Sequence, residues 1–485
     1  MTTQFSPEFQ RRTILKVSWR LLPLIVVAYL VAYIDRTNVA FAALTMNKDL
    51  GISAYMYGLG AGIFFLGYAL FEVPSNIVLE KVGARLWIAR IMITWGIISG
   101  LMAATTGPIS FLILRFLLGV AEAGFFPGII LYFTYWFPAQ YRGRVISTLF
   151  IAVPLGNALA SVVSGAILEM DGVWGLHGWQ WVFIIEALPA MLLAFVVLML
   201  MTDRPAVAHW LNADEKEWLE TELGAERAKI ETAGRLTLWR ALTDGRVLIL
   251  AMIYFTSVIA GYGITFFLPQ IVKGLGHSNF VTGLLTAIPY VIGVIGLICW
   301  GHSSDRRKER RWHLIVASLV AAIGLAGTTF FTGSAWALVT MSVAAVGLYG
   351  SRPCFWPMPS LFLTGAAAAG GIALINSIGN LGGYVGPFIV GWIKQSTDSF
   401  EMGVYFLAGC ALTSALITYF ATRATGVNAS REGLRARDQG LGAGDWGSTG
   451  TRHLFASRIP ATKRSTQPSS PRTTAAACAV GALLP

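Results

Sequence analysis

Long apolar stretches recur along this chain, and they restrict the possible folds more than any other feature. A helix needs about 20 predominantly apolar residues to cross the roughly 30 Å hydrocarbon core of a bilayer. Because backbone polar groups in lipid must be satisfied within the segment, the sequence predicts an all-α integral membrane protein. Twelve transmembrane helices are expected, at residues 21–44, 55–79, 86–106, 109–133, 145–168, 179–201, 247–272, 280–301, 312–332, 335–362, 366–392 and 403–422.

A charged segment between the sixth and seventh stretches divides these helices into two six-helix halves. Its acidic residues, which include Asp214, Glu217 and Glu220, indicate a cytoplasmic amphipathic helix. After the last stretch the chain becomes rich in Gly, Ser, Thr and Arg, so we expect a disordered basic tail there and favour it over a membrane-surface or regulatory tail. The expected parts are a cytoplasmic amino terminus at 1–20, the two halves at 21–201 and 247–422, the linker at 202–246 and the tail at 423–485.

The Lys and Arg residues of the short loops are distributed unevenly, which predicts the orientation. With a cytoplasmic amino terminus, thirteen lie inside and only Lys48, Lys273 and Lys394 lie outside. This bias accounts for much of the +11 net charge, so no nucleic-acid partner is expected. We predict a multi-pass protein of the bacterial inner membrane with both termini cytoplasmic. The inside residues are Arg11, Arg12, Lys16, Arg20, Lys81, Arg85, Arg142, Arg144, Arg306, Arg307, Lys308, Arg310 and Arg311.

An adjacent acid and base, Asp35 and Arg36, interrupt the first apolar stretch. A charge near the middle of a bilayer costs about 3 kcal/mol on insertion scales, so such residues face a protein or water-filled interior. The pair therefore suggests a substrate or ion pathway. The alternative is that Asp35 only neutralises Arg36.

The fourth stretch also carries a base and an acid, Arg115 and Glu122. Seven residues apart on a helix, they share a face and lie roughly 10 Å apart along the axis. A guanidinium presents a planar fork of donors suited to a carboxylate, so Arg36 and Arg115 are the expected ligands of an organic anion. Asp35 and Glu122 can change charge, so they are the expected proton-coupling residues. A buried network that only fixes helix packing is the alternative.

The loop after the second helix of each half carries an acid followed by basic residues. These loops resemble the cytoplasmic signature of the major facilitator superfamily, in which an acid pairs with arginines to latch the halves. The implied latch residues are Glu80 and Arg85 in the first loop, and Asp305 and Arg306 in the second. Glu80 departs from the usual aspartate, and the first loop lacks the leading glycine. Within the superfamily the chain resembles the anion:cation symporters, on the strings Tyr33–Asn38, Phe71–Asn76, Arg115–Gly124 and Asn376–Gly383.

This resemblance implies two halves that rock about a midplane site, with the first-helix and fourth-helix acids as protonation sites and the matching arginines as anion ligands. It also places Tyr33 and Tyr68 near the same cavity, although membrane tyrosines equally serve packing. Trp356, Ser360, Asn376 and Asn380 are the second half's substrate-binding candidates, with helix–helix hydrogen bonding as the alternative.

The function expected is proton-coupled uptake of an organic carboxylate, such as a sugar acid, a hydroxydicarboxylate or an aromatic acid, by a monomer. Proton-driven efflux is the alternative, although the fifth span, Val145–Leu168, lacks the glycine-proline signature expected of exporters in this superfamily. A membrane sensor is a further alternative. Enzyme chemistry is not expected, because all six histidines fall in loops, at span ends or in the tail. Neither a cofactor nor a metal is expected, since the four cysteines are scattered.

Overall fold

The computed structural model describes residues 5–232, 243–359 and 365–424, and this part of the chain contains helices and no strand. The first half holds α1 (Pro7–Asp49), α2 (Ala54–Val82), α3 (Ala84–Leu101), α4 (Pro108–Glu122), α5 (Phe125–Thr134), α6 (Ala139–Ile167) and α7 (Gly178–Leu200). The linker contains α8 (Ala213–Thr232). The second half holds α10 (Gly245–Lys273), α11 (Asn279–Arg307), α12 (Arg311–Phe330), α13 (Trp336–Phe355), α14 (Gly365–Thr397) and α15 (Glu401–Ala424).

Polar residues just before several helices fix where those helices begin. The side chains of Ser6, Ser53 and Ser278 accept backbone N–H groups from the first turns of α1, α2 and α11. Asp244 does the same for α10. These N-caps satisfy donors that the helix itself leaves unpaired.

Each of the twelve expected spans corresponds to a helix, but the fourth is broken. A turn at Ala123–Gly124 separates α4 from α5, and Gly124 has a φ of 86°. A Cβ on Gly124 would lie 2.2 Å from the Ser75 Oγ, so only glycine fits this turn. The stretch from 109 to 133 is apolar enough to be predicted as one span despite Arg115 and Glu122, so its hydropathy does not reveal the break.

The described helices place their apolar side chains outside and many polar side chains inside. Large apolar residues such as Met199 (79% exposed) and Phe330 (76% exposed) lie on the outer surface, whereas Asp35, Arg115 and Glu122 are buried. Within the described residues, eleven helices are long and apolar enough to cross a bilayer. The helix α13 is not one of the eleven, and it carries Arg352 near its end. This arrangement is that of a multi-pass membrane protein.

The two halves are in close contact at the end of the bundle where α1 ends and α2 begins, called here the α1–α2 end. A Cβ on Gly58 of α2 would lie 2.4 Å from the Pro387 carbonyl oxygen on α14. A Cβ on Gly283 of α11 would lie 2.3 Å from the Ser161 oxygen on α6. Small residues therefore allow backbone-to-backbone contact between the halves at this end.

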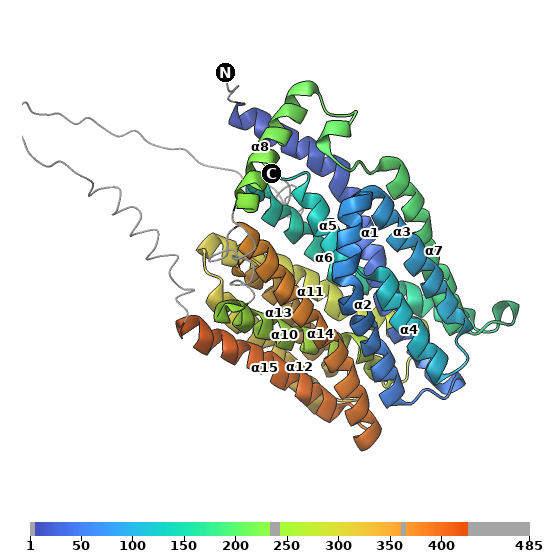
Figure 1. Ribbon diagram of the computed structural model, residues 1–485. Helices are drawn as coiled ribbons and strands as arrows, with labels where there is room; N and C mark the ends of the chain where they lie inside the picture. Colours follow the sequence, from blue (N-terminus) through green and yellow to red (C-terminus); the bar gives the residue numbers. More distant parts are fainter. Residues whose placement is uncertain (1–4, 233–242, 360–364, 425–485) are drawn as a thin grey trace, which may run out of the picture. The chain divides into compact units, whose positions relative to one another are not determined.

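The linker helix α8 lies beside the first turns of α1 (Figure 1). Lys16 forms a 2.7 Å ion pair with Glu215, and the Phe9 and Trp218 rings meet edge to face. Arg142 at the start of α6 forms a 2.9 Å ion pair with Glu226. The linker thus contains a helix, and this helix packs on the first half. The tail expected after 422 lies outside the described residues from 425 onward.

Candidate functional site

A cavity that is open to solvent lies between the two halves, and its empty volume, solvent at the opening included, is about 1110 Å³. Its lining includes two arginines, Arg36 from α1 and Arg352 from α13, and no Asp or Glu of the described residues. The wall is otherwise aromatic, aliphatic and amide in character. Seven tyrosines contribute to it: Tyr29, Tyr33, Tyr68, Tyr254, Tyr262, Tyr290 and Tyr349. A cationic, acid-free, aromatic wall suits a small anion.

Arg36 links the cavity to a buried acid behind it. One guanidinium nitrogen pairs with the Glu122 carboxylate of α4. The other donates to the Tyr262 hydroxyl of α10, at 3.1 Å. The guanidinium carbon lies 5.0 Å from the centre of the Tyr33 ring and 5.5 Å from that of Tyr68. Arg36 is therefore held at the cavity wall by its charge partner and by aromatic faces.

Asp35 faces away from its neighbour Arg36, since adjacent helix residues point about 100° apart. Its carboxylate accepts the Trp95 indole N–H at 2.9 Å and the Ser99 hydroxyl at 2.8 Å, both from α3. Glu186 of α7 is a further buried acid, and it accepts the Ser164 hydroxyl at 2.6 Å. Neither acid lines the cavity.

Arg115 is fully buried between α4 and α2 and does not line the cavity. Its guanidinium donates to the backbone oxygens of Gly60 at 3.1 Å and Ala61 at 3.3 Å, and it lies 5.1 Å from the Phe64 ring centre. Glu122, predicted on the same face of α4, pairs with Arg36 instead. The structure thus brings Arg36 and Glu122 together and places Arg115 in a separate packing site.

The remaining sequence candidates divide into three groups. Asn376 and Asn380 of α14 line the cavity, and Asn376 donates to the Glu72 carboxylate of α2 at 3.0 Å. Trp356 lies behind the wall, stacked 5.9 Å from the cavity-lining Phe150. Ser360 lies outside the described residues.

Sequence reasoning missed Arg352, Tyr262 and Asn157, which all line the cavity. A signal for Arg352 was present, because it is a lone charge inside a predicted span, the criterion that selected Arg36. Nothing in the sequence distinguishes Tyr262 or Asn157 from other membrane residues. Their contribution depends on which helix faces meet.

Comparison with known proteins decides the family. Residues 25–387 match the family model described as Major Facilitator Superfamily. The chain belongs to the major facilitator superfamily. Proteins with this family's fold are transporters rather than enzymes.

Relatives in the superfamily carry different substrate names. One from Agrobacterium vitis, named "Putative tartrate transporter", is 50% identical over 418 residues, covering 86% of this chain and 93% of the relative. One from Acinetobacter baumannii, named "Quinolone resistance transporter", is 44% identical over 413 residues, covering 85% and 95%. The inward open xylose transporter XylE from E. coli has a TM-score of 0.66 at 17% identity, covering 83% of this chain and 96% of that one, and this likeness concerns the fold alone.

The superfamily's signature loops make different contacts in the two halves. Glu80 and Arg85 have exposed side chains, and the Arg85 backbone N–H donates to Asp203 at 2.8 Å. In the second loop Asp305 pairs with Arg310, whereas Arg306 is exposed. The basic partner of Asp305 is therefore Arg310, five residues on, because the chain turns back between α11 and α12.

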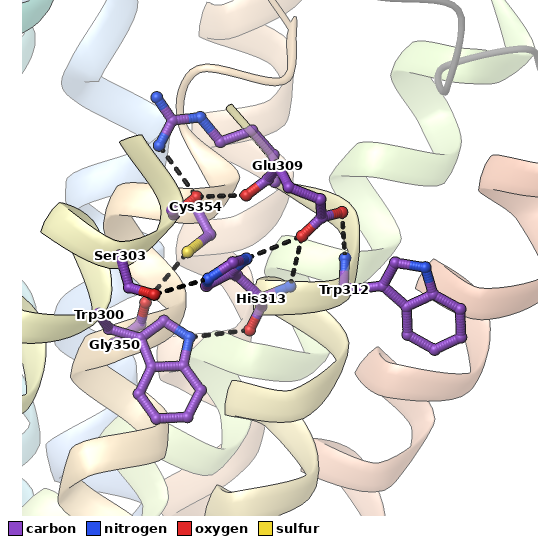
Figure 2. A network of polar contacts seen from close by, with 9 residues as sticks. Trp300, Ser303, Glu309, Trp312, His313, Gly350 and Cys354 are labelled. Atoms are coloured by element: carbon purple, nitrogen blue, oxygen red, sulfur yellow. Dashed lines mark hydrogen bonds and ion pairs between the residues drawn. The ribbon is translucent and has the colours of Figure 1, made fainter. Parts of the chain in front are cut away.

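Glu309 organises the same loop (Figure 2). Its carboxylate accepts the backbone N–H groups of Trp312 at 2.7 Å and His313 at 3.1 Å, and one oxygen lies 2.8 Å from the His313 ring. The other ring nitrogen meets the Ser303 hydroxyl at 3.1 Å, while the Trp300 indole donates to the His313 backbone oxygen. Burial alone would raise the pKa of Glu309, but these hydrogen bonds hold it below its ordinary value.

Replacing Glu309 with alanine should free the first turn of α12. Because folding lowers the pKa of Glu309, its stabilisation of the start of α12 is complete above the ordinary pKa of glutamate. This stabilisation is lost as the pH falls through the lowered pKa. Loss of a helix cap costs about 1 kcal/mol, so amides of the first α12 turn should exchange about five times faster near neutral pH. Hydrogen-exchange mass spectrometry measures this. The exposed His302→Ala variant is the control, and equal protection in Glu309→Ala and wild type at neutral pH would contradict the assignment.

Proposed function

We propose that this chain is a monomeric, proton-coupled symporter that takes up an organic carboxylate across a bacterial inner membrane, with both termini cytoplasmic. The observation that carries the proposal is Arg36, a guanidinium at the wall of a cavity that no described Asp or Glu lines, with the Glu122 carboxylate buried behind it. The orientation rests on the unequal loop charges. Among the described residues, both halves of one chain contribute to the cavity wall, which is compatible with a monomer.

Coupling follows from competition for one guanidinium. A carboxylate that enters the cavity accepts donors from Arg36, and this weakens the ion pair between Arg36 and Glu122. A buried carboxylate without its cation is costly, so Glu122 takes up a proton when the substrate binds. Binding of proton and anion is then linked, and each favours the other.

The other predicted residues have supporting roles in this proposal. Asp35, held by Trp95 and Ser99, is a second protonation site near Arg36 in sequence but separate from the cavity. Arg115 fixes α4 against α2 and adds positive potential behind the site. Tyr33, Tyr68, Asn376 and Asn380 complete the substrate wall. Rocking of the halves opens and closes the glycine contacts at the α1–α2 end.

Proton-driven efflux is the second candidate, and the relative named for quinolone resistance favours it. The aromatic wall of the cavity would accommodate a planar drug. Against this, a cationic wall to which the described residues add no acid favours anions over the cationic compounds that many exporters carry. The name of the Agrobacterium vitis relative, which refers to tartrate, agrees with a carboxylate substrate.

Gradient-driven uptake into proteoliposomes tests the proposal. The panel consists of radiolabelled sugar acids, hydroxydicarboxylates and aromatic acids. At least one of them should accumulate in the proteoliposomes when the outside solution is acidic. That acid should only equilibrate when no gradient is imposed. Efflux is the function if no acid accumulates and an inside-acidic gradient instead drives a fluoroquinolone into the vesicles in exchange for protons.

A further inference from the structure

Arg352 is the second arginine that lines the cavity, and the function proposed above gives it no role. It lies near the end of α13, partly exposed to the cavity. Its guanidinium donates to the Tyr254 hydroxyl at 3.1 Å and lies 5.3 Å from the centre of that ring. Tyr254 therefore holds Arg352 in place, much as Tyr262 contacts Arg36.

The two cavity arginines differ in their counterions. Arg36 is paired with Glu122, whereas no carboxylate of the described residues forms an ion pair with Arg352. A cation held inside a membrane protein without a counterion is costly. The missing negative charge is therefore one that a ligand can supply.

One helix of the second half holds both guanidinium groups. Arg36 donates to Tyr262 and Arg352 to Tyr254, and these tyrosines stand eight residues apart on α10, about 12 Å along its axis. A Cβ on Gly261, between them, would lie 3.6 Å from one Arg352 nitrogen. The cations thus face the same space from different helices, α1 of the first half and α13 of the second.

An amide side chain in the same wall has a hydrogen-bond acceptor that is unpaired within the described part of the chain. Asn157 of α6 is 4% exposed and donates to the Tyr349 hydroxyl at 3.0 Å, while its oxygen has no hydrogen-bond partner among the described residues. Asn157 lines the cavity, and its buried oxygen becomes an acceptor for a ligand hydroxyl if the side chain turns toward the cavity.

We propose that the cavity selects a short dicarboxylate dianion, with one carboxylate on Arg36 and the other on Arg352. This inference rests on the proposed carboxylate transport and adds Arg352 as the residue that determines specificity for the second charge. A dianion held between the halves also neutralises both cavity cations at once. A monocarboxylate leaves Arg352 without a counterion and binds more weakly.

Comparison of a diacid with its monoester isolates the second charge. The probes are tartrate, which also carries hydroxyl donors for Asn157, and monomethyl tartrate, which has one carboxylate fewer. Their dissociation constants are measured on the purified full-length wild type and on Arg352→Gln. Wild type should bind tartrate about 10 to 100 times more tightly than the monoester, and Arg352→Gln should remove most of that ratio. Arg352→Lys should keep part of it.

The outcomes separate this inference from the proposed function. If Arg352→Gln leaves monoester binding unchanged, the variant is folded and its loss of affinity is specific to the dianion. If Arg352→Gln weakens diacid and monoester equally, or if wild type shows no preference for the diacid, the inference is wrong even where a carboxylate is transported. If no carboxylate of the wider panel is bound or transported, the proposed function itself fails.

Discussion

Arg36→Ala is expected to abolish carboxylate binding, lowering affinity by about 100-fold or more. Removing one partner of a buried, hydrogen-bonded charge pair costs about 2–5 kcal/mol. Here the variant loses the ligand's main donor and leaves Glu122 without its cation. Equilibrium binding of a radiolabelled carboxylate to purified protein measures the loss. Arg36→Lys should recover only part of the affinity, because an ammonium lacks the planar fork.

The matched control for this variant is Arg12→Ala. Arg12 lies on the same helix, α1, but it is exposed and more than six helical turns before Arg36. Affinity in this control should equal that of wild type. Near-normal binding in Arg36→Ala would show that the guanidinium serves packing rather than the substrate.

Glu122→Gln is expected to uncouple transport from the proton gradient. The neutral amide imitates a permanently protonated Glu122, so Arg36 is free for the substrate and no proton is exchanged. Substrate exchange between the two sides of a proteoliposome should persist within about threefold of wild type, while gradient-driven accumulation should fall at least tenfold, since the linkage between proton and anion is removed. The exposed Glu220→Gln variant of α8 is the control, and it should accumulate substrate normally.

Two other results would count against the role of Glu122. Accumulation that survives in Glu122→Gln would move the proton site elsewhere, and Asp35, which has its own donors on α3, would be the next residue to replace. Loss of both exchange and accumulation in a folded variant would indicate that Glu122 is needed to position Arg36.

The fold was largely predictable because a bilayer leaves few options. Apolar length alone identifies the helices, and the apolar exterior that the structure displays is the physical reason. Two details of the fold could not be predicted from the sequence. The break at Gly124 depends on a close approach to Ser75, and the extension of α1 beyond its apolar run begins with the cap at Ser6. Both are set by local contacts rather than by hydropathy.

The site was predictable only in part, because sequence shows which charges are buried but not which face one another. Arg36 stood out as an intramembrane charge, and the structure places it at the cavity. The partner of Glu122 could not be read from spacing along α4, since the pairing with Arg36 joins two helices. Arg115 donates to two backbone oxygens of α2, and such contacts have no sequence signature. Arg352 carried the same signal as Arg36.

The most direct measurement of coupling follows the proton itself. Proteoliposomes that hold a pH-sensitive dye, with no imposed gradient, receive the transported carboxylate outside. Symport predicts that the lumen acidifies as the anion enters, and that Glu122→Gln abolishes the acidification while exchange continues. A lumen that becomes alkaline, or that keeps its pH while the carboxylate enters, would contradict proton symport.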